Sequence, residues 1–188
     1  MKRLAAVFVS TLVLFAVSAF AQAPLQVSIT QGGTTSDVAA NGAVTMSSGA
    51  VGQPAVATLK ITYTGSLTAI VTGVSFVGTS AIGVLSAAPF PIVLDPNTST
   101  TMTLQYLPVS GNSVTAQVSI AVTEGTQASV FPFSITGSSP DLAFSYFIAP
   151  NGSLNALSAD GQITFPATNI GTPVTAVVTI LNRGSASG

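Results

Sequence analysis

The sequence predicts an all-β protein, an antiparallel β-sandwich, and three observations support this fold class. Apolar and polar residues alternate through many short segments, as they do in strands that bury one face. Gly, Pro, Asn and Asp separate these segments at short intervals, which favours a sandwich of short strands. No segment after residue 24 shows the i, i+3, i+4, i+7 apolar spacing of a helix.

Alternation is clear in the long segment 55–64. Ala55, Leu59 and Ile61 fall on one face of the expected strand, and Lys60 falls on the other. Because a charged side chain in the middle of a strand discourages unwanted pairing, Lys60 indicates solubility and protection of a sheet edge rather than catalysis.

Turns and alternation together define the strands that follow. Asp95-Pro96-Asn97 is a turn before 98–107, and Ser110-Gly111-Asn112 is a turn before 113–123. Pro132 lies in the outward phase of the next strand, and because proline cannot donate to a ladder, we expect that strand to be an edge there. The expected strands are 25–30, 43–47, 55–64, 69–77, 90–94, 98–107, 113–123, 129–137, 142–148, 162–166 and 174–182. We expect one core to contain Leu59, Ile61, Leu104, Val118, Ile120, Phe133 and Ile135.

The sequence also repeats itself at a spacing of 119 positions. Residues 41–66 fall on 160–185 without a gap, and both the turn residues and the inward apolar residues are kept. The matched pairs include Asn41-Gly42 with Asp160-Gly161, Gly52-Gln53-Pro54 with Gly171-Thr172-Pro173, Ala57 with Ala176, Ile61 with Ile180, Gly65-Ser66 with Gly184-Ser185, Ile29 with Ile148 and Gly33 with Gly152.

The repeat length sets the domain organisation. It is close to the ~100 residues of an immunoglobulin-like sandwich, which predicts one complete domain at 25–139. Gly137-Ser138-Ser139-Pro140-Asp141 forms the joint, and 142–188 supplies only the first strands of a second, truncated repeat. We therefore expect the chain to be a fragment of a longer repeat protein.

The second repeat is expected to lack its facing sheet. Its strand 174–182 presents Val174, Ala176, Val178 and Ile180 inward, and a piece of two or three strands is marginal in water. The second repeat is then poorly ordered alone, packs on the first repeat, or completes a sandwich with another chain. The sequence favours a tail with no fixed position relative to the first repeat, and self-association through the open second repeat.

The N-terminus predicts export. Lys2 and Arg3 precede an apolar run, and Ala19-Phe20-Ala21 fits the small-x-small rule for signal-peptidase cleavage. Residues 1–21 are therefore expected to be a signal peptide, cleaved before Gln22. An uncleaved membrane anchor is the alternative, but the apolar core is shorter than the roughly 20 residues that a spanning helix needs. A secreted, periplasmic or cell-surface location follows, with no membrane span after cleavage.

Composition excludes several classes of activity. The chain has no Cys and no His, so a disulfide framework, a thiolate zinc site, a Ser-His-Asp triad and a Cys-His dyad are all impossible. An exported chain without disulfides is more typical of a bacterial envelope than of small animal domains. Four Lys and Arg against five Asp and Glu leave no basic surface for nucleic acid, so nucleic acid is not expected as a partner.

No residue is a candidate for catalysis, for cofactor binding or for metal binding. Asp residues in turns ordinarily cap their own backbone, and a calcium-loop pattern, a nucleophile elbow and a phosphate loop are missing from the sequence. We therefore expect no enzyme activity and no cofactor. The acidic residues of the expected mature chain lie in or beside predicted turns and are Asp37, Asp95, Glu124, Asp141 and Asp160.

Aromatic residues leave two alternatives open. They either fill the core, or they line a site for a sugar or a peptide. The aromatic residues concerned are Phe76, Phe90, Tyr106, Phe131, Phe133, Phe144, Tyr146 and Phe147. The last three flank the joint.

Several stretches resemble the ASH / choice-of-anchor D (hydin-like) family of Ig-like domain repeats. Val51-Gly52-Gln53-Pro54 resembles the segment before the family's long strand, and Tyr106-Leu107-Pro108-Val109-Ser110-Gly111 resembles its aromatic-x-Pro stretch with a following Gly. Further resemblances are Leu94-Asp95-Pro96-Asn97-Thr98-Ser99, the closing strand Phe133-Ser134-Ile135-Thr136-Gly137, and the Asn-x-Gly-Ser turn of Asn182-Arg183-Gly184-Ser185. The first repeat departs from that turn, with Tyr63 in place of Asn, so its turn is expected to be built differently.

The resemblance implies a seven-stranded sandwich that serves as a spacer or a binding module. Together with the signal peptide, it points to a non-catalytic structural or adhesive Ig-like repeat module of a secreted or cell-envelope bacterial protein. The alternative is a carbohydrate- or peptide-binding module that uses loops or an edge strand. Neighbouring Ig-like repeats or other envelope proteins are the expected partners.

Overall fold

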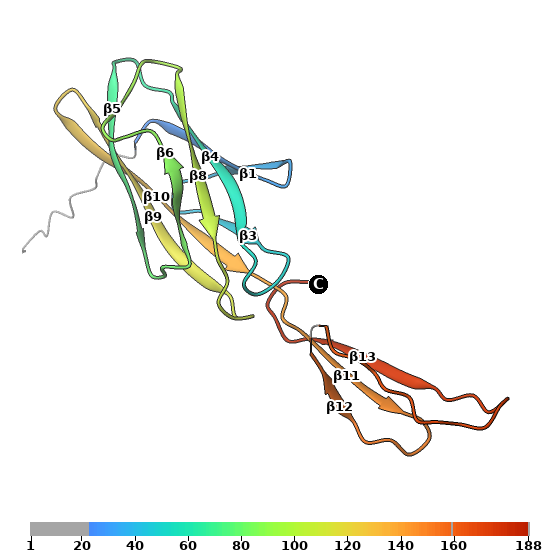
Figure 1. Cartoon of the computed structure of the whole chain (residues 1–188). Coiled ribbons are helices and arrows are strands. Elements are labelled where there is room, and N and C mark those ends of the chain that lie inside the picture. The colour runs from blue at the N-terminus through green and yellow to red at the C-terminus, as the bar shows by residue number, and fades with distance from the viewer. Residues whose placement is uncertain (1–22, 159, 188) are drawn as a thin grey trace, which may run out of the picture.

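A computed structural model describes residues 23–158 and 160–187, so the predicted signal peptide lies outside the described residues. Two five-stranded sheets form a sandwich, and a three-stranded sheet follows at one end of it (Figure 1). The strands are β1 (Leu25–Gln31), β2 (Thr34–Val38), β3 (Ala43–Ser47), β4 (Ala55–Tyr63), β5 (Ala69–Val77), β6 (Ile82–Ala87), β7 (Ile92–Leu94), β8 (Ser99–Tyr106), β9 (Val114–Glu124), β10 (Gln127–Ser138), β11 (Leu142–Ile148), β12 (Asn155–Leu157) and β13 (Ala176–Asn182).

The predicted fold class is confirmed. One sheet has the order β2-β1-β4-β8-β6 and the other has the order β3-β10-β9-β5-β7, and the two pack as an Ig-like sandwich. All neighbouring strands are antiparallel except β3 and β10, which run parallel. The predicted core is also confirmed, because every member is buried between the sheets: Leu59, Ile61, Leu104, Val118, Ile120, Phe133 and Ile135.

The strand prediction is wrong in two places within the first repeat. β2 and β6 were not expected, so the sandwich has ten strands rather than the eight expected for this repeat, and more than the seven that the resemblance implies. β2 reads Thr-Thr-Ser-Asp-Val and is exposed except at Val38, so it has no alternation to detect. β6 is interrupted by an irregularity between Val84 and Ser86, which breaks its period of two. Asp37 consequently lies in an edge strand and not in a turn.

Lys60 does not protect a sheet edge. β4 lies between β1 and β8, and Lys60 pairs with Ser28 on one side and with Thr101 on the other. Its side chain is exposed on the outer face of a central strand, which supports solubility alone. Pro132, by contrast, is at an edge as predicted, because β3 pairs with β10 only from Ser134 onward.

The turns at two pairs of repeat-equivalent positions have the same backbone geometry. Asn41 and Asp160 both have a positive φ, at 60° and 61°, and Gly52 and Gly171 share the same left-handed region at 79° and 87°. Equivalent backbone bonds close these turns, since Gly42 N donates to Ala39 O at 2.9 Å and Gly161 N donates to Ser158 O at 3.0 Å.

The first strands of the two repeats are offset by 117 positions rather than 119. Leu25 pairs with Tyr63 in the first repeat, and Leu142 pairs with Asn182 in the second (142 − 25 = 117; 182 − 63 = 119). The predicted match of Ile29 with Ile148 is therefore wrong by two residues. The loop between β11 and β12 holds the two additional residues, and a shift of two keeps the same side chains on the inner face.

The segment 162–166, which we expected to be a strand, is not one. Its equivalent in the first repeat is β3, whose ladder is made with β10. The described part of the second repeat contains no equivalent of β10, so this segment has no strand to pair with.

Two buried tyrosine hydroxyls lack a hydrogen-bond partner among the described residues, those of Tyr63 and Tyr106. Leaving a buried hydroxyl unsatisfied costs about 1–3 kcal/mol. Tyr106→Phe removes this hydroxyl and keeps the ring, so we expect an unchanged or higher free energy of unfolding in a denaturant melt. A loss of more than about 1 kcal/mol would show that the hydroxyl is satisfied.

Tyr63 also predicts how stability changes at high pH. Burial and the nearby Glu124 carboxylate raise the pKa of Tyr63 to about 12. The folded state therefore holds this proton more tightly than the unfolded state does. The stabilisation of the fold that results is fully present below pH ~10, and it is lost as the pH rises toward 12. Unfolding midpoints measured across that range are expected to fall less steeply in Tyr63→Phe than in the parent chain.

Candidate functional site

The joint between the two repeats is a polar site held by several hydrogen bonds. Only three residues, 139–141, separate β10 from β11. Ser138, Ser139 and Pro140 are buried, although a short linker between independent domains is ordinarily exposed. The polar groups of this linker therefore have to find partners in the two repeats.

The first repeat supplies partners from the turn between β8 and β9. The Ser139 hydroxyl donates to the Ser110 carbonyl oxygen at 3.2 Å. The Ser185 amide, which belongs to the second repeat, donates to the Gly111 carbonyl oxygen at 2.8 Å and to the Ser139 carbonyl oxygen at 3.0 Å. One amide thus connects the linker, the second repeat and a turn of the first repeat.

The second repeat supplies partners from its Asn-x-Gly-Ser turn. The Asn182 side-chain oxygen accepts from the Asp141 amide at 3.1 Å and from the Gly184 amide at 2.9 Å. The Arg183 amide donates to the Asp141 carbonyl oxygen at 2.8 Å. The Arg183 guanidinium also lies 3.6 Å from the Asp141 carboxylate, but both side chains are largely exposed, and such a pair contributes at most about 1 kcal/mol.

Two glycines permit the close approach of the repeats. A Cβ on Gly111 would lie 2.7 Å from the Asp141 Cβ and 2.9 Å from the Gly184 Cα. A Cβ on Gly184 would overlap the backbone of Ser139, Pro140 and Asp141. Any larger residue at either position would force the repeats apart.

The first repeat has a turn equivalent to Asn182-Arg183-Gly184-Ser185, but with different side chains. The Thr64 amide donates to the Pro24 carbonyl oxygen at 2.9 Å, which matches the bond from Arg183 to Asp141. Tyr63 replaces Asn182 there, and its ring is fully buried in the core with Gly65 packed against it. As expected, this turn is built differently from the Asn-x-Gly-Ser turn.

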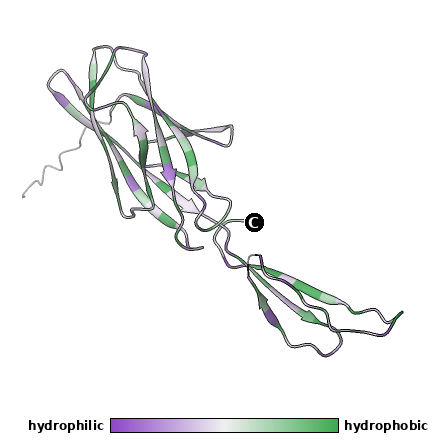
Figure 2. Cartoon of the chain, viewed as in Figure 1, coloured by the Kyte–Doolittle hydropathy of each residue, from purple (hydrophilic) through white to green (hydrophobic). Residues whose placement is uncertain are grey.

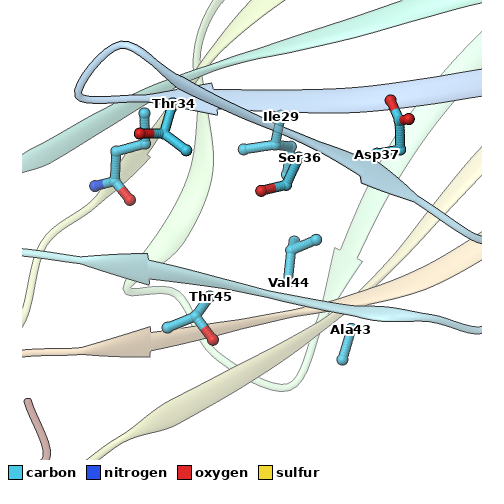
Figure 3. Close-up of a pocket in the computed structure, with 8 residues that line it drawn as sticks. Ile29, Thr34, Ser36, Asp37, Ala43, Val44 and Thr45 are labelled. Carbon is cyan, nitrogen blue, oxygen red and sulfur yellow. The ribbon is translucent and has the colours of Figure 1, made fainter.

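A groove between two edge strands is the second candidate. β2 and β3 border a cavity of about 350 Å³ (Figure 3), whose lining includes Ile29, Ser36 and Val44. Val44 points toward Ile29 and Ser36, whereas the Asp37 carboxylate points away from β3. Gln31 also lines the cavity, and its side chain donates to the Ser47 carbonyl oxygen at 2.7 Å and accepts from the Ser47 amide at 3.1 Å.

The carboxylates of Asp95 and Glu124 accept hydrogen bonds from a loop, and the carboxylate of Asp141 lies at the joint. Asp95 accepts from the Thr68 hydroxyl at 3.0 Å, and Glu124 accepts from the Leu67 amide at 3.3 Å. In residues 23–158 and 160–187, acidic side chains do not gather into any group of three that would suit a metal ion. Over the same residues, we find no helix with the length and hydrophobicity to traverse a bilayer.

The aromatic residues divide between the core and the second repeat. Tyr106, Phe131 and Phe133 are buried in the core, as one of the two alternatives predicted. Phe76 packs at the edge of that core. Phe144 is exposed, and Tyr146 and Phe147 are half-buried, all on β11.

The sequence identified the linker and the Asn182–Ser185 turn but not their contact with the turn at Ser110 and Gly111. That contact joins residues about 30 and 75 positions apart (139 − 110 = 29; 185 − 111 = 74), and no local pattern reports it. Gly111 and Gly184 were the sequence features that could have indicated this contact, because glycine often marks a close approach of two backbones.

No protein-family model and no curated protein matches the chain. Among solved structures, the ASH / PapD-like domain 7 of human CEP192 is similar at 12% identity and a TM-score of 0.45, over 70% of this chain and 96% of that one. The VesB protease of Vibrio cholerae is similar at 11% identity and a TM-score of 0.46, over 52% of this chain and 30% of that one. The secreted serine protease VesC of the same organism gives 11% identity and a TM-score of 0.40, over 77% of this chain and 46% of that one.

Proposed function

We propose that the chain is a non-catalytic structural or adhesive module of a secreted or cell-envelope bacterial protein, in which Ig-like repeats are held end to end. The joint is the observation that supports this proposal. Its linker is buried, and hydrogen bonds connect it to a turn of each repeat. A spacer needs such a joint, because a flexible linker would let successive repeats fold back on one another.

The distance between the repeats tests this proposal. The chain contains no Cys, so spin labels attach only at Lys60→Cys and Thr179→Cys, which are repeat-equivalent exposed sites. A pulsed electron-spin measurement is expected to give one narrow distance distribution. Gly184→Val is expected to broaden it, because the new side chain overlaps the linker backbone.

The matched control is Gly49→Val. Gly49 has open space around the position of a Cβ, so this change is expected to leave the distribution narrow. A distribution that is already broad in the parent chain would contradict the proposal, and so would equal effects of the two glycine substitutions.

Export is part of the same proposal. Lys2 and Arg3 before an apolar run, with Ala19-Phe20-Ala21 after it, support cleavage by signal peptidase. In a bacterial host, N-terminal sequencing of the exported chain is expected to begin at Gln22. A chain that stays in the cytoplasm with Met1 in place would contradict this location.

Binding of an extended peptide or a sugar is a second candidate function, favoured by the groove between β2 and β3. Both strands are at sheet edges, and edge strands bind extended peptides through their free backbone groups. Ser36→Trp would fill the groove. Binding to a peptide or glycan array that this substitution abolishes would favour recognition over a purely structural role.

A further inference from the structure

Part of β5 is an unpaired sheet edge within the complete first repeat. β7 pairs with β5 only from Ala69 to Val71. Residues 73–77 therefore have β9 on one side and, within the part of the chain that the structure describes, no strand on the other. Pro91 directly precedes β7 and has no amide hydrogen to donate, so it cannot extend that ladder. We call residues 73–77 the free edge.

The free edge lacks the usual protection against pairing with another chain. Charged residues commonly protect such edges, but the sequence has none between Lys60 and Asp95. The bulge of β5, between Val71 and Gly73, lies before the free edge and not within it. Figure 2 shows hydrophobic residues along β5. The free edge is therefore open to a further strand.

Two inward side chains of the free edge are incompletely covered. Val74 and Phe76 point inward, because they pair with the buried Ile120 and Val118 of β9. Both pack against the core and yet are only half-buried. A strand added beyond β5 would cover them.

The outer face of the free edge carries both a projection and a hollow. Val77 is 66% exposed, whereas a Cβ on Gly73 would meet no atom within 4 Å. A hollow of about 450 Å³ lies at this glycine, and its lining includes Ser75 and Ser119. Gly73 and Val77 lie two residues on either side of Ser75, so the hollow and the projection are symmetric about it.

We infer that two copies of this chain associate by antiparallel pairing of their free edges, about a two-fold axis at Ser75. This register sets Val77 of each copy opposite Gly73 of the other copy, where the hollow accepts its side chain. It also sets Val74 opposite Phe76 of the other copy, and pairs of a β-branched and an aromatic residue are favourable across strands. A two-fold interface requires a surface that is complementary to itself, and the free edge has this property.

The length of the free edge sets the expected strength. A strand of five residues is about 17 Å long. One such strand pair buries well below the ~800 Å² per partner of a standard stable interface, so the dimer is expected to be weak. The association goes beyond the proposed spacer role, since it concerns contact between chains rather than within one.

Sedimentation equilibrium of the chain from Gln22 onward tests the inference over about 1 µM to about 1 mM, which brackets a weak dimer. The parent chain is expected to shift from monomer to dimer. Gly73→Val is expected to weaken the dimer by about 10-fold or more, because two valines then meet at each end of the ladder. Gly83→Val is the matched control, because Gly83 also lies on a strand with open space around the position of a Cβ. It is expected to leave the dimer unchanged.

An exchange of the projection and the hollow tests the register itself. Val77→Gly alone removes the projection and is expected to weaken the dimer. A mixture of the Gly73→Val chain with the Val77→Gly chain is expected to dimerise again, because a valine then faces a glycine at both ends of the ladder. The double variant Gly73→Val/Val77→Gly is expected to dimerise like the parent chain for the same reason.

A parent chain that stays monomeric over the whole range would overturn the inference and leave the free edge to a strand of a different protein. Equal effects of Gly73→Val and Gly83→Val would also overturn it, because the chains would then associate through another surface. Failure of both the mixture and the double variant to dimerise would overturn the register at Ser75.

Discussion

Leu104→Ala is expected to lower the free energy of unfolding by about 2–5 kcal/mol, the range for a large-to-small change in a core. Leu104 is completely buried on β8, between Ala57 of β4 and Val84 of β6. The shortened side chain leaves a cavity that the two flanking ladders prevent from closing. Ile120→Ala, on the opposite sheet, is expected to cost a similar amount for the same reason.

Denaturant melts of the two variants measure this loss. Leu85→Ala is the control, because Leu85 is exposed on β6 and its truncation is expected to change stability by less than about 0.5 kcal/mol. If Leu104→Ala and Ile120→Ala both behave like the control, the assignment of which side chains of β8 and β9 face the core is wrong.

Gly137→Val is expected to cost about 1–3 kcal/mol or more through overpacking. A Cβ on Gly137 would lie 2.5 Å from the Tyr106 ring, and both residues are buried. Gly137 ends the closing strand that resembles the ASH family, and Tyr106 begins the aromatic-x-Pro stretch. The structure brings these two sequence motifs into contact.

A double-mutant cycle tests this contact. Gly137→Val is expected to cost less in a Tyr106→Leu background, because the smaller side chain leaves room for the new methyl groups. Additive effects of the two substitutions in denaturant melts would show that the ring and the glycine do not constrain each other.

The sequence predicts those strands whose apolar alternation is complete. β4, β8, β9 and β10 begin and end within two residues of the expected bounds. β2 could not be predicted, because an exposed edge strand needs no apolar residues and is formed by pairing with β1. The segment 162–166 was predicted to be a strand because its sequence pattern matches β3. A strand also requires a partner strand, and a local sequence pattern does not report whether one is present.

The candidate site was predictable only in parts. Asn182-Arg183-Gly184-Ser185 and the linker were visible as turn chemistry, since Asn and Gly have local preferences. Their contact with the turn at Gly111 depends on how two folded repeats meet. The two-residue difference in loop length between the repeats was hidden as well, because a shift of two leaves the apolar pattern unchanged.

The exchange rate of the Ser185 amide tests the account most directly. This amide donates to the carbonyl oxygens of Gly111 and Ser139, so it exchanges only when the joint opens. Hydrogen exchange followed by NMR is expected to show Ser185 slowed by about 100-fold or more relative to an unstructured amide, although its own turn is exposed. Exchange at the unstructured rate would contradict the account, because the repeats would then not be held end to end.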